Sequence, residues 1–158
     1  MTSSLQQTVD IITRAAGWNN ASPDGDGVFR FSLEGGLDFE LFSPDSSTGI
    51  LLAKLGAAPS GDDAQSESEI QRLAALAAGS LKKRRSVFGI GESGLELHRS
   101  FRLATATETA LVAEVRDFLN DLAWWKLQIS GSADSADARP SPFSFSFGAW
   151  PTADSFQG

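Results

Sequence analysis

The sequence predicts an α+β fold in which a twisted, mainly antiparallel sheet packs against helices in the order α-β-β-β-α-β-β-α. Three observations carry this prediction. Apolar residues recur at helical spacing in three segments, they alternate in two pairs of segments, and 158 residues with 41% hydrophobic content suit one domain with a real core. We assign residues 1–130 to this domain and residues 131–158, a Ser/Pro/Phe-rich segment, to a C-terminal tail outside it.

The N-terminal part of the domain predicts a short helix followed by a hairpin. Leu5, Val9, Ile12 and Ala16 share one helical face, and Gly17 suits the helical stop. Two alternating runs come next, namely Phe29, Phe31 and Leu33, then Leu37, Phe39 and Leu41. A loop through residues 34–36 pairs these runs in a single register, which also sets Arg30 across from Glu40.

The middle of the chain predicts a central strand and a second helix. Residues 50–55 are apolar on both sides of the pleat, as in a strand that is covered on both faces. Ser66-x-x-Glu69 is typical of a capping box, and the helical pattern that it opens ends near Gly79. The basic run Lys82-Lys83-Arg84-Arg85 suits the negative end of that helix, and a patch for an acidic partner is the alternative.

The last part of the domain predicts a second hairpin and a long helix. Residues 86–90 and 95–103 form the strands, and one side of the second strand carries Leu95, Leu97, Phe101 and Leu103. The segment 89–94 matches G-x-G-x-x-G, but a strand follows it where a phosphate site needs a helix, so we assign these glycines to the turn. Thr105-x-x-Glu108 is the predicted cap of the final helix, whose apolar stripe is Leu111, Val115, Phe118, Leu122, Trp125 and Ile129.

Composition argues against most catalytic chemistry. The chain has no cysteine and one histidine, so thiolate nucleophiles, disulfides and the usual zinc shells are absent. That histidine, His98, lies on the polar side of its strand, and no G-x-S-x-G elbow accompanies it. The acidic loop 24–27 hints at calcium, but Val28 and Gly35 stand where an EF-hand needs oxygen ligands. We therefore expect no enzyme activity, no metal and no cofactor.

The net charge and the N-terminal sequence limit the partners and the cellular compartment that we expect. A formal charge of −7 repels phosphate backbones and anionic membranes, so we expect neither a nucleic-acid nor a membrane partner. Residues 1–10 lack the basic start and apolar centre of a signal peptide, and no apolar run approaches the ~20 residues that span a bilayer. We expect a cytoplasmic protein.

Adjacent tryptophans indicate a protein partner. Neighbouring residues on a helix point about 100° apart, so Trp124 and Trp125 cannot both face one core. We expect one of the two rings to meet a partner.

These elements, in this order and in a small acidic chain, resemble the chaperones of bacterial type III secretion systems, the CesT/SycE-like class I family. The resemblance covers Leu5 to Ile129. Its main pieces are the helix sequence 115–125, with Phe118-Leu119-Asn120 before the tryptophans, and the strand pair Val87-Phe88-Gly89-Ile90 and Leu95-Glu96-Leu97. Within the family the chain looks closer to the multi-effector export-control chaperones of plant pathogens. The Phe-rich tail departs from the compact family pattern.

The resemblance implies a homodimeric bacterial cytoplasmic chaperone without ATPase activity. Such a protein keeps the N-terminal segment of secreted effector proteins unfolded and competent for export, and the export-apparatus ATPase is a further candidate partner. The alternative is a small cytoplasmic adaptor or regulator of similar topology that docks on a folded protein. Truncating the N-terminal segment of a bound effector separates the two, because only the chaperone should lose binding.

Apolar residues supply the candidate sites. An effector segment should meet the first helix and the first hairpin, with the partner-binding candidates Leu5, Val9, Phe29, Phe31, Phe39 and Phe42. A thin sheet and the second helix have more apolar length than one subunit can cover, which predicts a homodimer with the interface candidates Leu73, Leu76, Phe88 and Leu97.

The tail carries its own aromatic cluster of Phe143, Phe145, Phe147 and Trp150. Serines separate the three phenylalanines, so in an extended chain their rings project from one face, as in an added strand. Exposed rings invite aggregation, which favours docking in a client groove as a placeholder that an effector displaces. The alternative is a floppy tail.

Overall fold

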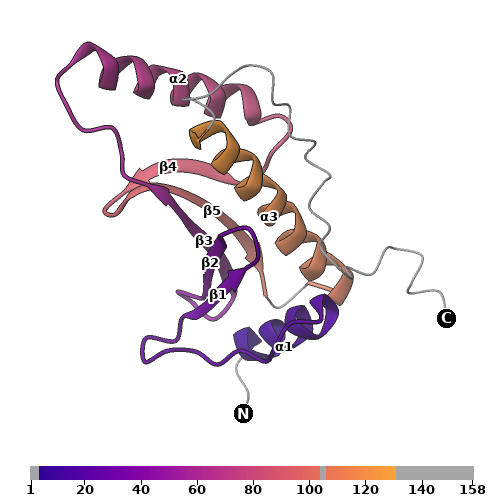
Figure 1. Cartoon of the computed structure of the whole chain (residues 1–158). Helices are drawn as coiled ribbons and strands as arrows, with labels where there is room; N and C mark the ends of the chain where they lie inside the picture. Colours follow the sequence, from indigo (N-terminus) through magenta and orange to yellow (C-terminus); the bar gives the residue numbers. More distant parts are fainter. Residues whose placement is uncertain (1–3, 104–105, 131–158) are drawn as a thin grey trace.

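The computed structural model describes residues 4–103 and 106–130 and confirms the predicted α+β class and element order (Figure 1). The elements are α1 Ser4–Ala16, β1 Phe29–Leu33, β2 Leu37–Phe42, β3 Thr48–Gly56, α2 Ala64–Ser80, β4 Val87–Gly91, β5 Gly94–Arg102 and α3 Glu108–Ser130. The tail residues Phe143, Phe145, Phe147 and Trp150 lie outside the described part of the chain, as does Thr105. No described helix is long and apolar enough to cross a membrane.

The five strands form one antiparallel sheet in the order β1-β2-β3-β5-β4, so β3 is central as predicted. The first hairpin has the predicted register, with Phe31 opposite Phe39 and Arg30 opposite Glu40. The tight turn after β1 contains Gly35 and Gly36 at φ of 80° and 72°, a region that glycine enters without steric cost. Residues 89–94 form the second hairpin's end, because Gly91 pairs with Gly94.

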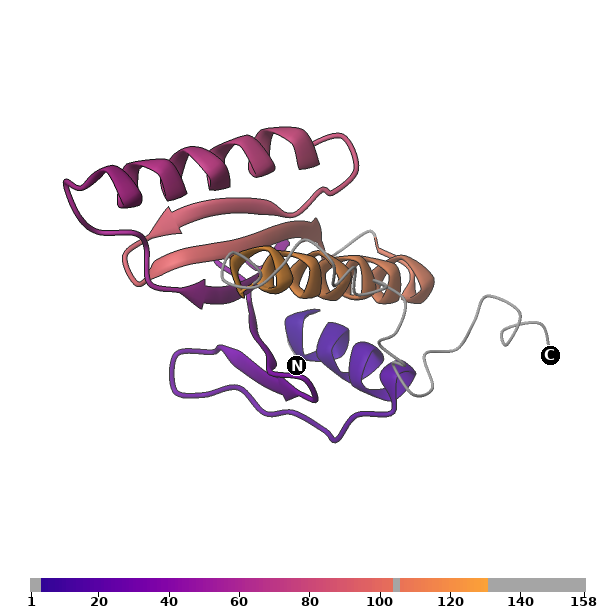
Figure 2. The same cartoon turned by 45° about the horizontal axis from the view of Figure 1, so that its top comes forward.

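Helices α1 and α3 bury one face of the sheet (Figure 2). The predicted stripe of α3 is confirmed: Val115, Phe118, Leu122 and Trp125 are all fully buried, while Ile129 at the helix end is half-buried. The expectation that β3 is covered on both faces is wrong for the described part of the chain. Leu51 and Ala53 are buried beneath the helices, but Leu52 on the opposite face is only half-buried. Among the described elements no helix lies on that outer face.

Both helix caps differ from the predicted ones by a few residues. Asp63 caps α2, since its carboxylate accepts from the Ser66 backbone N–H at 2.9 Å, and Ser66 lies inside the first turn. Thr107 caps α3, because its hydroxyl accepts from the Ala110 N–H at 3.2 Å. In each case the residue directly before the first helical residue provides the cap.

Candidate partner-binding surfaces

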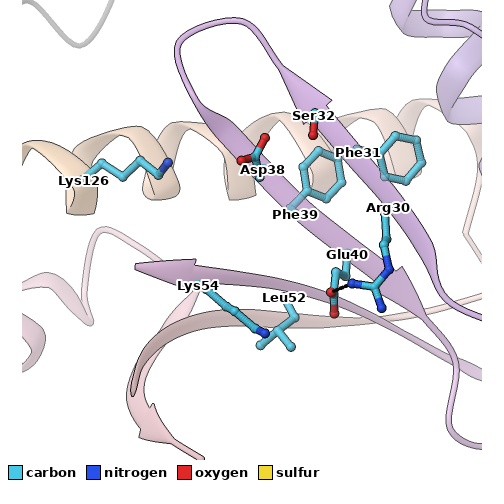
Figure 3. A pocket seen from close by; sticks show the side chains of 9 residues that line it. All are labelled: Arg30, Phe31, Ser32, Asp38, Phe39, Glu40, Leu52, Lys54 and Lys126. Atoms are coloured by element: carbon cyan, nitrogen blue, oxygen red, sulfur yellow. Dashed lines mark hydrogen bonds and ion pairs between the residues drawn. The ribbon is translucent and has the colours of Figure 1, made fainter. Parts of the chain in front are cut away.

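The β2–β3 ladder stops halfway and opens a pocket beside the first hairpin. Only three pairs join the strands, from Glu40–Leu52 to Phe42–Ile50, so residues 37–39 separate from residues 53–56. We call the cavity of about 310 Å³ at this opening the hairpin pocket. Figure 3 shows the side chains that line it, which are Arg30, Phe31, Ser32, Asp38, Phe39, Glu40, Leu52, Lys54 and Lys126.

The hairpin pocket combines an apolar surface with a charged rim. The rings of Phe31 and Phe39 stack with centroids 4.8 Å apart, and Trp18 packs against Phe31 at 5.8 Å. Arg30 pairs with Glu40, and Lys126 of α3 donates to the backbone carbonyl of Gly36 in the hairpin turn. Among the described residues no ion pair reaches the exposed Lys54. The pocket can therefore accept an apolar side chain next to a cation.

The pocket continues into an apolar stripe on the outer face of the sheet. The pairing sets Phe42 beside Ile50, and it sets Leu52 beside His98, which in turn pairs with Val87. Phe42, Ile50 and Leu52 are half-buried, and Val87 is 45% exposed. His98 is exposed, as predicted. Extended apolar surface of this kind is typical of a face that meets another chain.

The structure places most of the partner-binding candidates in the core. Five of them are buried: Leu5, Val9, Phe29, Phe31 and Phe39. Phe31 and Phe39 nevertheless line the hairpin pocket, and Phe42 is half-buried on the outer face. Sequence reasoning missed Leu52 and Lys54, because a strand that is apolar on both sides does not reveal which face stays open. The role of these candidates in binding stays a prediction.

A second surface lies along α2 and the edge strand β4. Of the residues of α2 only Leu73 is buried, and four large apolar side chains on or beside these elements are exposed by 41% to 67%: Ile70, Leu81, Val87 and Ile90. The strand β4 ends the sheet, so one of its edges has no neighbour among the described strands. Val87 belongs to the outer face because it pairs with His98, whereas Ile90 pairs with Leu95 on the helix side, so we call Ile70, Leu81 and Ile90 the α2–β4 face. An unpaired edge next to exposed apolar residues favours association.

The predicted dimer residues take different places. Leu73 and Leu97 are buried inside the subunit. Phe88 is half-buried and stacks on Trp125, with ring centroids 4.1 Å apart. Leu76 is half-buried and faces α3 rather than the α2–β4 face. Their predicted role between subunits stays untested, and the exposed residues of the α2–β4 face are the ones that the sequence did not single out.

A third surface is a groove between the end of α2 and α3. This α2–α3 groove has a volume of about 320 Å³ and is lined by Ala75, Leu76, Gly79, Ser80, Lys83, Arg84 and Trp124. Trp125 is fully buried, whereas Trp124 is half-buried and forms one wall. The guanidinium of Arg84 lies over the Trp124 ring, 4.5 Å from its centroid. The two tryptophans therefore face different environments, as their spacing predicted.

A buried ion cluster holds Arg84 in this position. Arg84 donates to Asp121 of α3 at 3.0 Å, and the other carboxylate oxygen of Asp121 accepts from the Ser86 backbone N–H at 3.3 Å. Arg99, on the buried side of β5, pairs with Glu114 at 2.5 Å and lies 3.8 Å from Asp121. The cluster ties the basic run and the start of β4 to α3. Arg84 thus has a structural role, whereas no ion pair among the described residues reaches the other three cations of the run.

Comparisons with known proteins identify chains of similar fold. No protein-family profile matches the sequence, and no curated protein matches it at a significant level. A chain of the HopA1–SchA chaperone–effector complex matches with a TM-score of 0.60 and 20% identity, over 78% of this chain and 93% of that one. A chain of the ExsC–ExsE complex matches with a TM-score of 0.60 and 16% identity, over 80% and 93%.

The third match connects the fold with secretion. It is a chain of the Yersinia pestis type III secretion chaperone SycH in complex with a stable fragment of YscM2, with a TM-score of 0.56 and 8% identity, over 77% of this chain and 98% of that one. The chain has a type III secretion chaperone fold. The predicted resemblance is confirmed at the level of the fold.

Proposed function

We propose that this protein is a non-enzymatic cytoplasmic chaperone of type III secretion, which binds the unfolded N-terminal segment of effector proteins. The observation that carries the proposal is the hairpin pocket, an amphipathic cavity at a gap in the sheet, on a fold shared with a chain of the HopA1–SchA chaperone–effector complex. The net charge of −7 supports solubility while an apolar client is bound.

An extended client segment suits this part of the sheet for two reasons. The β2–β3 ladder ends at Glu40–Leu52, so residues 37–39 and 53–56 have no ladder partner across the gap, and their backbone groups can pair with an extended segment. One apolar side chain of that segment would then enter the hairpin pocket and contact Leu52, while a carboxylate near it would meet Lys54. Backbone pairing tolerates many sequences, which is what a chaperone of several clients needs.

Titration with candidate effectors tests the proposal. Calorimetry on the full chain should show binding of full-length effectors and loss of binding when their N-terminal segments are removed. Leu52→Asp should weaken binding by about tenfold to a hundredfold, since burying one leucine side chain contributes ~1.5–3 kcal/mol. Ser100→Asp is the matched control, because Ser100 is exposed on the same face but lies outside the hairpin pocket.

Two results would reject the proposal. Binding that survives removal of the effector's N-terminal segment would point to an adaptor for folded proteins. Binding that is weakened equally by Leu52→Asp and Ser100→Asp would place the client elsewhere. Circular dichroism of both variants checks that each is folded.

We further infer that the protein is a homodimer that associates through the α2–β4 face. The three exposed apolar side chains of this face and the edge of β4 that has no neighbour among the described strands support it. This face lies at the β4 edge of the sheet, whereas the hairpin pocket lies at the β2–β3 gap, and β5 separates β3 from β4. Dimerisation therefore leaves a client pocket open on each subunit.

A further inference from the structure

The α2–α3 groove is separate from both the hairpin pocket and the α2–β4 face. It shares no lining residue with the hairpin pocket. Gly79 in the groove follows Ile70 of the α2–β4 face by nine residues, which is about 180° around the helix. Neither client binding nor dimerisation as proposed above needs the groove. An apolar groove with Trp124 half-buried in its wall is left without an occupant among the described residues.

Unpaired cations of the basic run lie in and next to the groove: Lys83 lines it, and Lys82 and Arg85 are close to Lys83 in the chain. Lys82, Lys83 and Arg85 are exposed, and within residues 4–103 and 106–130 no ion pair reaches them, whereas Arg84 is held by Asp121. The chain contains only 13 Lys and Arg against 20 Asp and Glu, so three unpaired cations in one place stand out from an acidic surface. Their charge favours an acidic occupant.

The chain's own tail has the matching chemistry. Asp134 and Asp137 lie close to its start, and the rings of Phe143, Phe145 and Phe147 follow. Such a cluster of phenylalanines is better accommodated in an apolar groove than in water. The tail therefore offers carboxylates for the cations and rings for Trp124 and Leu76.

The tail also begins in the right place. Trp124 precedes Ser130, the last residue of α3, by six residues or about 9 Å of helix. Arg72 of α2 donates to the Gln128 carbonyl at 3.2 Å, so α2 runs beside the end of α3. The 13 residues from Ser130 to Phe143 span at most about 45 Å when extended, which is more than enough to turn back into the groove.

We propose that residues 131–158 dock in the α2–α3 groove of their own subunit, with a phenylalanine of 143–147 against Trp124 and Leu76 and with Asp134 and Asp137 at the basic run. The tail is then a built-in occupant of this groove and not of the hairpin pocket. It leaves the client pocket free and covers the apolar surface that adjoins the ion cluster.

Disulfide trapping in the full chain tests the proposal, because the protein has no cysteine of its own. Phe145→Cys is combined with Gly79→Cys in the groove, where an added Cβ meets nothing within 4 Å. The matched controls combine Phe145→Cys with Ser32→Cys at the hairpin pocket, or with Gly89→Cys on β4, where a Cβ also meets nothing. Ala75→Cys gives a second, exposed groove position.

If the tail docks, the cysteines of both groove pairs should form disulfides at least about tenfold faster than those of both control pairs, because a docked tail has a high effective concentration at the groove. The disulfide should lie within one chain, so the product should be monomeric. Lys83→Glu with Arg85→Glu, or 1 M salt, should slow the groove pairs severalfold. Four results would overturn the proposal. The first two are equal oxidation rates at all positions and fastest trapping at Ser32→Cys. The other two are a covalent dimer as the main product and an oxidation rate that charge reversal does not change. These outcomes do not depend on an effector, so they are independent of the proposed function.

Discussion

Single residues show how strongly the fold depends on polar groups that the sequence pattern conceals. Arg99 lies between Leu97 and Phe101 on the buried side of β5 and is only 5% exposed. A buried cation is stable only with partners, which Glu114 and Asp121 of α3 provide. The predicted apolar side of β5 did not include this position, and no local pattern reveals partners that lie 15 and 22 residues further along the chain.

Asp45, in the turn between β2 and β3, makes stability depend on pH. Its carboxylate accepts from the backbone N–H groups of Ser47 and Thr48 at 3.0 and 2.7 Å, and these bonds lower the pKa of Asp45 from its ordinary value of 3.8. A lowered folded-state pKa stabilises the protein above the unfolded-state pKa, and the stabilisation disappears as the pH falls through the folded-state pKa.

Asp45→Ala should therefore be less stable than the parent chain near neutral pH, and the difference should shrink below about pH 4. Urea unfolding at pH 7 and at pH 3 measures it. Asp38→Ala is the control, because Asp38 is exposed and no hydrogen bond to its side chain is found among the described residues. A difference in stability between Asp45→Ala and the parent chain that is the same at both pH values would contradict the lowered pKa of Asp45.

At the scale of elements, helix boundaries depend on which residue the chain uses as a cap. The pattern of α3 was predicted correctly, yet its cap is Thr107, whose hydroxyl accepts from Ala110 N–H while its carbonyl accepts from Leu111 N–H at 2.9 Å. A capping-box pattern allows several starts within one turn, and packing of the first turn selects among them.

Thr107→Ala should cost ~0.5–2 kcal/mol of stability, which lowers Tm by roughly 2–4 °C per kcal/mol in a chain of this size. Thr105→Ala replaces the cap that the capping-box pattern suggested, and it should leave Tm nearly unchanged. Thermal unfolding followed by circular dichroism compares the two variants. The reverse order of effects would restore Thr105 as the cap.

At the scale of the whole molecule, α2 packs only weakly against the rest of its own subunit. Only Leu73 among its residues is buried, while Ile70 beside it is 41% exposed and Ile90 of β4 is 63% exposed. Helices gain most of their stability from packing of an apolar face, so a helix with this little internal packing calls for a second surface. The α2–β4 face of a second copy supplies one.

Light scattering at micromolar concentration should give twice the chain mass of 16.8 kDa. Ile70→Asp with Ile90→Asp should yield monomers, because each places a charge in the apolar contact. Ser32→Asp, at the far end of the sheet, should leave the mass at the dimer value. A parent chain that scatters as a single subunit would refute the dimer.

The sequence by itself determined the element order, the register of the first hairpin and the core stripe of α3. These features follow from periodicity and turn residues, which act over a few neighbouring positions. It also led to the resemblance that the fold comparisons support.

Only the tertiary structure decided which apolar residues remain open. Phe39 and Leu52 look alike in the sequence, but the first is buried under the helices and the second lies on the outer face. The hairpin pocket exists because the β2–β3 ladder stops at Glu40–Leu52, and the α2–α3 groove exists because Asp121 holds Arg84 against Trp124. Burial and charge pairing of this kind depend on contacts between residues distant in the chain, which no local pattern encodes.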